Sequence, residues 1–353
     1  MKYFKYILGI LAIISLCQAC QKTPVYKNDF PTTEHVFADT IPFDEIIKVG
    51  TIHKTDSFII LRDIQNNATD FFYVYSTKDF KHLYSFCTKG NGPDEYLMPT
   101  VIKNMPNNRF GIRDHATDII TTYELTNTAA VLIDSYHFPP QDGRFCWEIN
   151  YISEDCYLLK RNDARASARE LWNLKEKILL DTIPNSFDLA AQMGKDYHIE
   201  FDDCWISASD STFAFAYYFI NRIEYGKITG NTIQTEGYTG VNKTPDFYLF
   251  KKAGFNSKYK YNVDNNIVYY EDLALSPSYI YALYSGKPWG DTETEHSSII
   301  EIYDKSGNPI RQLNLNHPIA SFVVDENNGF IYGINPETSE GNILRFKISQ
   351  NND

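Results

Sequence analysis

The sequence has little positive charge for its length. Its 353 residues include 33 Lys and Arg against 45 Asp and Glu, so the formal net charge is −12 at pH 7. Because binding to nucleic-acid phosphates needs clustered Lys and Arg side chains, this balance excludes an electrostatic nucleic-acid binder, and we expect no nucleic-acid partner. Long apolar runs are also scarce. Beyond the N-terminus no segment approaches the 18 or so apolar residues of a spanning helix, so we expect a soluble body.

The signatures of several enzyme classes are missing as well. The sequence contains no His-Glu-x-x-His and no Gly-x-Ser-x-Gly, the motifs of zincin metalloproteases and of α/β-hydrolases. Its eight histidines are scattered without metal-ligand spacing. We therefore expect no cofactor and favour a non-catalytic protein, although these absences leave the question of catalysis open.

Aromatic residues, by contrast, are abundant. Phe, Trp and Tyr make up 15% of the chain, with 26 Tyr and 23 Phe, and hydrophobic residues make up 43%. This composition is typical of a globular protein rather than a disordered one. Because aromatic side chains suit the half-buried surface of a pleated sheet, it also favours β structure.

The N-terminus reads as a secretory signal. Met1 to Lys5 carries two lysines, and Tyr6 to Leu16 is an apolar run interrupted only by Gly9 and Ser15. A charged start followed by an apolar stretch of this length is typical of a signal peptide, and the stretch is too short to span a membrane.

The end of this signal resembles a bacterial lipobox. Ala19 precedes Cys20, although Cys17 stands where Leu is usual. The resemblance implies cleavage before Cys20, a diacylglyceryl group on its sulfur and an acylated amine; the alternative is an ordinary signal peptide that contains cysteine. Two or more acyl chains anchor a protein stably. We predict a signal at 1–19, a tether at 20–33, and an outer-membrane lipoprotein of the cell envelope, facing the periplasm or the cell surface.

Four cysteines remain in the body of the chain: Cys87, Cys146, Cys156 and Cys204. Export permits disulfides, and Cys146 and Cys156 could face each other across a hairpin. The irregular spacing fits no zinc motif, and we favour free buried thiols.

A repeated local pattern runs through residues 34–353. Six times a polar, turn-like cluster is followed by an aromatic residue and an alternating apolar strand. The aromatic residues are Phe58, Phe110, Tyr157, Phe213, Tyr279 and Phe330. Their mean spacing of about 54 residues lies near the repeat length of four-stranded propeller blades. Dividing residues 44–348 by six gives about 51 residues per blade, against about 61 for five blades and about 44 for seven.

The pattern therefore predicts an all-β fold, a single six-bladed β-propeller of four-stranded antiparallel blades. A large sandwich would not repeat its turn and strand so evenly, and a β-helix needs shorter rungs. Residues 164–177 are compatible with a short helix in a connector. The widest interval, between Phe213 and Tyr279, contains a basic and aromatic insertion near residues 246–265.

These features together resemble a known family. The signal with its lipobox, the sixfold pattern, the segment Lys89 to Tyr96 and the stretch Phe213 to Tyr225 are similar to the TolB-like six-bladed propeller lipoproteins of gut Bacteroidetes. The resemblance implies the fold and an envelope location. It implies no particular activity, because fold does not determine function.

Three arginines occupy matched positions in the first three repeats. Arg62, Arg113 and Arg161 each follow an anchor strand, with Asp63, Asp114 and Asn162 next in the chain. At matched register the three guanidinium groups would approach one face of the propeller, where they could bind a carboxylate or phosphate. The alternative, which we favour, is a set of Arg–Asp pairs and turn caps that join neighbouring blades.

Other side chains complete the candidate ligand site. The Gly90 to Pro93 segment lacks the Lys-Ser/Thr of a phosphate-binding loop, so we expect a turn that directs Glu95 and Tyr96 toward one face. Tryptophans at 147, 205 and 289 could stack on a sugar, although core packing is the commoner role. The candidate ligand-binding residues are Arg62, Glu95, Tyr96, Arg113, His115, Trp147, Glu148, Arg161, Asn221 and Arg222.

We expect a monomeric, envelope-anchored binding propeller whose partner is a glycan, a sugar acid or an envelope protein. The alternative is a metal-assisted hydrolase or lactonase with oxygen ligands near the axis. Its candidate ligands are Glu148, Asp202, Asp203, Asn221, Asp272 and Asn335. A third option is a structural protein that docks through the insertion Phe247 to Tyr261.

Overall fold

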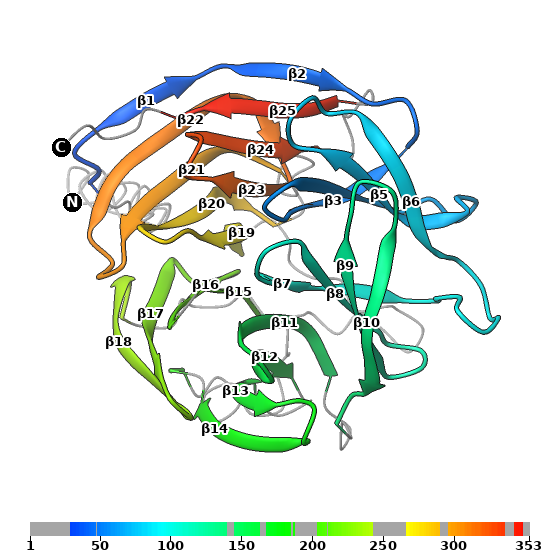
Figure 1. Cartoon of the computed structure of the whole chain (residues 1–353). Helices are drawn as coiled ribbons and strands as arrows, with labels where there is room; N and C mark the ends of the chain where they lie inside the picture. The colour runs from blue at the N-terminus through cyan, green and yellow to red at the C-terminus, as the bar shows by residue number, and fades with distance from the viewer. Residues whose placement is uncertain are drawn as a thin grey trace, which may run out of the picture.

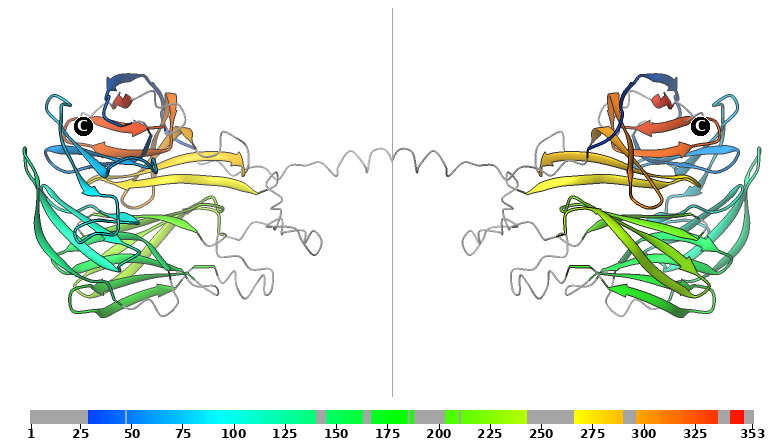
Figure 2. Two further views of the ribbon diagram at one scale, coloured as in Figure 1. Left: turned by 90° about the vertical axis from the view of Figure 1, so that its right-hand side faces the viewer. Right: turned by 90° about the vertical axis from the view of Figure 1, so that its left-hand side faces the viewer.

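The computed structural model describes ten parts of the chain: residues 29–46, 48–139, 145–162, 167–184, 186–187, 203–209, 211–242, 266–289, 296–335 and 342–348. These residues form 25 β-strands, and no helix among them is long and apolar enough to cross a membrane. The strands stand in mostly antiparallel sheets around a central axis, as Figure 1 shows face-on and Figure 2 from two sides. The predicted propeller is confirmed.

Six blades follow one another along the chain. Blade 1 contains β3 (Val49–Lys54), β4 (Phe58–Asp63), β5 (Asp70–Ser76) and β6 (His82–Thr88). Blade 2 contains β7 (Pro99–Lys103), β8 (Arg109–Asp114), β9 (Ile119–Leu125) and β10 (Ala130–His137). Blade 3 contains β11 (Phe145–Ser153), β12 (Cys156–Asn162), β13 (Ser167–Asn173) and β14 (Ile178–Pro184).

The second half of the chain continues this order. Blade 4 contains β15 (Cys204–Ser209), β16 (Thr212–Tyr217), β17 (Arg222–Thr229) and β18 (Thr232–Gly240). Blade 5 contains β19 (Ile267–Leu275), β20 (Tyr279–Pro288), β21 (Ser297–Asp304) and β22 (Pro309–Ile319). Blade 6 contains β23 (Ser321–Asp325), β24 (Phe330–Ile334) and β25 (Asn342–Lys347).

The N-terminal segment completes the ring. Strand β2 (Ala38–Pro42) pairs antiparallel with β25 and becomes the outermost strand of blade 6. Before it, β1 (Thr33–Val36) pairs parallel with β22 and adds a fifth strand to blade 5. Phe30 packs edge-on against Tyr303 at a ring-centroid distance of 5.3 Å. The segment therefore fastens two adjacent blades from outside.

The sheets alone do not show six units, because the innermost strands of blades 2 and 3 are hydrogen-bonded to each other. Strand β11 pairs parallel with β7, so these two blades form one eight-stranded sheet. The described core nevertheless divides into six clusters, each of which joins two adjacent blades. One such cluster joins blade 6 to blade 1 through Tyr332, Ile343, Ile52 and Leu61. The ring thus closes after six blades.

The repeated aromatic residues mark the same place in every blade. Each of the six is the first or second residue of the second strand, which begins after a tight turn. Three of these turns contain a residue with positive φ one or two positions before the strand begins: Asn107 (58°), Asp155 (64°) and Gly329 (71°). Because Asn, Asp and Gly tolerate this conformation best, the turns account for the polar clusters in the sequence.

Two further expectations are tested here. The short helix within residues 164–177 is wrong, because Ser167–Asn173 form strand β13, whose Leu171 and Trp172 are buried. Side chains that pack on both faces of a blade override the weak helical pattern of this segment. The four body cysteines are free and buried, which confirms that expectation.

Candidate functional site

The innermost strands enclose a cavity on the propeller axis. Its volume is about 500 Å³, and it is lined by residues of the innermost strands β3, β7, β15, β19 and β23, by the turns that follow some of them, and by the start of β8. The charged side chains of the lining are balanced: Lys54, Lys103 and Arg109 are cationic, and Asp56, Glu271 and Asp272 are acidic. The lining also contains aromatic rings and hydroxyl groups.

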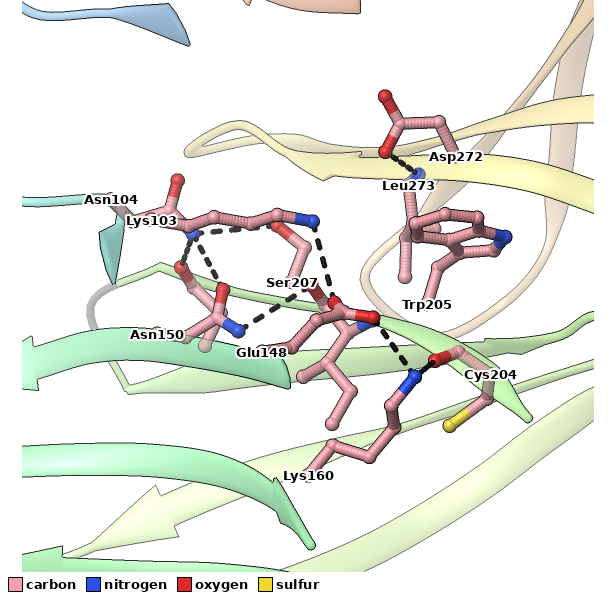
Figure 3. A network of polar contacts seen from close by, with 12 residues as sticks. Lys103, Asn104, Glu148, Asn150, Lys160, Cys204, Trp205, Ser207, Asp272 and Leu273 are labelled. Atoms are coloured by element: carbon pink, nitrogen blue, oxygen red, sulfur yellow. Dashed lines mark hydrogen bonds and ion pairs between the residues drawn. The ribbon is translucent and has the colours of Figure 1, made fainter. Parts of the chain in front are cut away.

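A buried ionic network lies beside this cavity, between blades 2, 3 and 4 (Figure 3). Glu148 on β11 accepts hydrogen bonds from Lys160 at 3.1 Å, from Lys103 at 3.4 Å and from the backbone N–H of Ile206 at 3.0 Å. Burial by itself raises the pKa of Glu148, but the two ammonium groups outweigh this effect and hold the pKa below its usual range. Glu148 is therefore an anion that joins three blades.

The two lysines of this network differ in how fully they are bonded. Lys160 donates to Glu148, to Asp203 at 2.5 Å and to the carbonyl of Cys204 at 2.7 Å, which uses all three of its protons. Among the described residues, Lys103 donates only the long bond to Glu148, and its side chain is 25% exposed. Lys160 is thus fully engaged within the protein, whereas Lys103 retains donors for a ligand.

Asp272 on β19 supplies an acceptor to the cavity. Its two carboxylate oxygens accept hydrogen bonds from the backbone N–H groups of Leu273 at 2.8 Å and Phe322 at 3.2 Å, which fixes the carboxyl group between blades 5 and 6. Burial raises the pKa of Asp272, and the nearby positive charge of Lys103 only partly offsets this. Each carboxylate oxygen can accept a further bond.

Aromatic rings complete the wall. The indole N–H of Trp205 donates to the carbonyl of Tyr270 at 2.8 Å, and Lys103 Nζ lies 5.8 Å from the centroid of the Trp205 ring. The imidazole of His53 on β3 forms a hydrogen bond with the hydroxyl of Thr51 at 2.9 Å and packs edge-on against the Phe110 ring. Burial, with the positive charges of Lys103 and Arg62, lowers the pKa of His53 to about 3, so the imidazole is neutral at pH 7.

Polar side chains also tie the innermost strands to one another. Asn104 donates to Asn150 on β11 at 3.2 Å and to Ser207 on β15 at 3.4 Å. Ser207 in turn accepts the N–H of Leu275 on β19. Lys54 on β3 and Asp325 on β23 form an ion pair at 3.5 Å. These contacts fix the innermost strands relative to one another.

The three matched arginines lie between blades, outside the lining of this cavity. Arg113 is fully buried, donates to the carbonyl of Cys146 and pairs with Asp118 at 2.6 Å. Arg113 and Arg161 both face the ring of Phe138, at 3.7 and 5.3 Å. Arg62, whose positive charge lowers the pKa values of His53 and His115, lies at the junction of blades 1 and 2. The three arginines therefore do not converge in the axial cavity.

Arg222 and Asn221 are likewise engaged within the protein. Arg222 is buried, pairs with Glu224 at 2.7 Å and stacks on Tyr238 at 3.7 Å. Asn221 accepts a hydrogen bond from the hydroxyl of Tyr270 at 3.0 Å.

The loop before β7 has the expected turn character. Glu95 is exposed, and its carboxylate accepts the N–H of Gly92 at 2.6 Å. A Cβ atom at Gly90 would overlap this carboxylate, and the positive φ of Gly90 lies at the edge of the region that only glycine adopts readily. The hydroxyl of Tyr96 bonds that of Tyr123 at 2.5 Å. Glu95 therefore stabilises the loop itself, and Tyr96 joins the loop to β9 of blade 2.

The tryptophans occupy different environments. Trp147 is 47% exposed and stacks on His115 at a centroid distance of 4.5 Å. Trp289 packs edge-on against Phe219 at 5.1 Å. Only Trp205 lines the axial cavity.

The candidate metal ligands take part in separate interactions instead of facing one common point. Among the residues that the structure describes, no three His, Cys, Asp or Glu side chains converge as a metal site would require. Glu148 and Asp203 bind lysines, and Asn335 donates to the carbonyl of Pro318. Asp202, the insertion Phe247 to Tyr261 and the lipidation candidate Cys20 lie outside the described residues.

Sequence reasoning missed Lys103 and His53 as site residues and weighed Asp272 only as a metal ligand. Both missed residues belong to innermost strands, which lack the repeated aromatic residue. A usable signal exists in Val101 to Lys103 and Ile52 to Lys54, where an apolar strand ends in basic residues. Such a charge in an otherwise apolar strand is expected where the strand faces water or a ligand, or where the charge is paired inside the protein.

Comparisons with known proteins agree with this architecture. A family model described as TolB-like 6-blade propeller-like matches residues 34–327. No curated protein matches the chain significantly. The β-propeller domain of Cps50 (Swd1) from Myceliophteria thermophila has a TM-score of 0.50 at 9% identity, with 88% of this chain and 98% of that chain covered. A Bacteroides fragilis protein described as exported has a TM-score of 0.49 at 14% identity, covering 90% and 99%. At such identities the likeness concerns the fold alone.

Proposed function

We propose a ligand-binding role for this chain, which belongs to the TolB-like six-bladed propeller family. The propeller binds a small, uncharged, hydroxyl-rich molecule, a mono- or disaccharide, in its axial cavity. One observation carries this proposal: Lys103, with unused donors, and Asp272, with unused acceptor positions, share a cavity of about 500 Å³ with the Trp205 ring.

The chemistry of the lining favours a sugar over other small molecules. Hydroxyl groups both donate and accept, so they suit a wall that offers an ammonium group, a carboxylate and the hydroxyls of Ser207 and Ser209. A planar indole suits the apolar face of a sugar ring. The balance of three cationic and three acidic side chains offers no net attraction to an ion. The volume also lies within the usual range of small-molecule sites.

The proposal includes an envelope location. We infer that Cys20 is lipidated and that the propeller is an outer-membrane lipoprotein, supported by the charged and apolar N-terminus and the Ala19–Cys20 pair. The described structure is compatible with a tether, because residues 33–36 enter the fold at the outer edge of blade 5 rather than in its core.

Binding can be measured by isothermal titration with a panel of glucose, galactose, maltose, cellobiose and glucuronate, on protein that begins at Gln21. We expect at least one neutral sugar to bind, and Lys103→Met to weaken its binding about tenfold or more, because a hydrogen bond from a charged donor contributes about 1.5–3 kcal/mol. Lys227→Met is the matched control, since Lys227 pairs with Glu236 on the surface.

Three results would contradict the proposal. They are an absence of binding across the neutral sugars, undiminished affinity in the Lys103→Met variant, or an equal loss in the Lys227→Met control. Preferential binding of glucuronate would instead indicate a sugar acid as the ligand and refute the uncharged class.

A further inference from the structure

A second exposed surface lies away from the axial cavity. Leu97, Met98 and Trp147 are 44%, 50% and 47% exposed, and His115 stacks beneath Trp147. We call these four residues the Trp147 patch. They are contiguous, because the N–H of His115 donates to the carbonyl of Met98 at 3.2 Å and Trp147 covers the imidazole. Apolar groups gathered in this way on a surface mark an interaction site more often than scattered ones do.

The backbone turns Trp147 outward. The register between β11 and β12 shifts between Cys146 and Glu148, so Trp147 is the extra residue of a β-bulge. Bulges re-aim side chains, and here Cys146 and Glu148 point into the protein while the indole between them stays in solvent. The exposure of Trp147 is therefore built into the strand.

The patch is held rigidly from below. The carboxylate of Asp114 accepts the N–H groups of Leu97 and Met98, at 3.1 and 3.0 Å, which fixes the loop that carries them. His115 bonds Thr100 at 2.9 Å. Burial and the positive charge of Arg113 lower the pKa of His115 to about 4, so the ring that supports the indole is neutral at pH 7. A rigid aromatic surface loses little conformational entropy on binding.

Three of the described carboxylates beside the patch already have partners within the protein. Asp114 accepts a third N–H, from Ala116, Asp118 pairs with Arg113, and Glu95 accepts the N–H of Gly92. A sugar on Trp147 would find few free partners here, in contrast to the axial cavity with Lys103. The surface thus fits an apolar occupant better than a carbohydrate.

The described surroundings of the patch are acidic. Asp94 and Glu95 precede Leu97 in the same loop and are exposed, and Asp118 is 45% exposed. The lysine of this loop, Lys89, donates to the carbonyl of Gln65 and lies over the Phe71 ring. An apolar centre with acidic neighbours is complementary to an apolar segment flanked by Lys or Arg. It disfavours an anionic lipid surface.

The patch also lies far from the point where the N-terminal segment joins the ring. Blades 2 and 3 carry the patch, whereas β1 lies on blade 5, across the ring in Figure 1. The innermost strands run in the same direction. The patch lies at the end of the propeller where β7 begins. Strand β22 runs antiparallel to the innermost strand β19. Because β1 is parallel to β22, it begins at the end of the propeller opposite to the patch. A partner can reach the patch without crossing the N-terminal segment.

We propose that the Trp147 patch docks an extended or helical apolar segment, flanked by basic residues, of a partner protein. This site is separate from the axial cavity and does not depend on the sugar-binding proposal. Trp147 is the central contact, because buried tryptophans dominate the binding energy of protein interfaces.

The test selects from a phage-displayed library of random 12-residue peptides on protein that begins at Gln21, which retains every described residue. We expect enriched peptides with aromatic or aliphatic centres and Lys or Arg on either side. Their affinity should fall at least tenfold in Trp147→Ala and should decrease with rising salt. Val131→Ser is the matched control, because Val131 is equally exposed (51%) on the outer strand of blade 2. It should leave binding unchanged.

The following outcomes would contradict the proposal. Selection that enriches no peptide over the Trp147→Ala protein, or that enriches acidic or purely polar peptides, would overturn it. Self-association that is lost in Trp147→Ala would make a second copy of the chain the occupant. Binding to vesicles of phosphatidylethanolamine and phosphatidylglycerol that is lost in Trp147→Ala would make it a lipid surface. Thermal unfolding of each variant separates lost binding from lost folding.

Discussion

The neutral histidine of the axial cavity makes a sharp prediction about acid stability. The pKa of His53 is about 3 in the folded protein, against 6.5 for an unperturbed histidine. The unfolded chain therefore binds a proton on His53 more readily than the folded protein does. By linkage, the stability that depends on neutral His53 is fully present above pH 6.5 and is lost as the pH falls toward 3.

The size of the effect follows from these two pKa values. At pH 5.5 an unfolded histidine is about 90% protonated, whereas folded His53 remains neutral. The free energy of unfolding should therefore fall by about 1.4 kcal/mol between pH 7.5 and pH 5.5 on account of His53. Because the imidazole borders a cavity that water can enter, this is an upper value. His115, whose pKa is lowered to about 4, should contribute in the same direction but less, because solvent screens this more exposed imidazole.

The assay is urea unfolding at pH 7.5 and pH 5.5, followed by intrinsic fluorescence. His53→Gln should reduce the loss of stability between the two pH values by about 1 to 1.4 kcal/mol relative to the unsubstituted protein. Phe213→Leu, which alters a buried ring of blade 4 stacked on Phe215 and not on His53, should lower stability equally at both pH values. An unchanged pH dependence in His53→Gln would show that folded His53 takes up the proton and would refute the argument.

Two further predictions concern the anchor and the core. Cys20→Ser should abolish the incorporation of labelled fatty acid in cells, and continued labelling of the variant would contradict the lipoprotein assignment. Phe138→Ala should lower the free energy of unfolding by about 3–5 kcal/mol, because it creates a cavity and removes the ring that faces both Arg113 and Arg161. Urea unfolding measures this loss, and Phe138→Leu should lose less; a loss below about 1 kcal/mol would show that the stacked arginines do not depend on the ring.

The fold could be predicted from the sequence because every blade repeats the same local pattern, a turn followed by an aromatic residue that packs between blades. In three of the six turns a residue with positive φ strengthens this pattern: Asn107, Asp155 and Gly329. This signal is local and survives without knowledge of the rest of the chain. The strand at Ser167–Asn173 was mistaken for a helix because its burial on both faces depends on neighbours that are distant in sequence.

The site was harder to predict because it depends on which way each side chain points. Arg113 and Arg161 do occupy matched positions on second strands, as the sequence suggests. Their side chains, however, point into the interfaces between blades, whereas the axial cavity is lined mainly by innermost strands. Lys103 and His53 reach it from innermost strands, which lack the repeated aromatic residue. Sequence periodicity identifies the strands but does not show which of them is innermost.

The pairing of β2 with β25 joins residues 38–42 to residues 342–347. The last blade therefore needs two segments about 300 residues apart in the sequence, and the ring cannot close until β25 is available to pair with β2. Under the export that we propose, the chain must stay unfolded while it passes through a secretion channel. A ring that closes only through β25 suits this requirement, because the stable state cannot form before that strand is free.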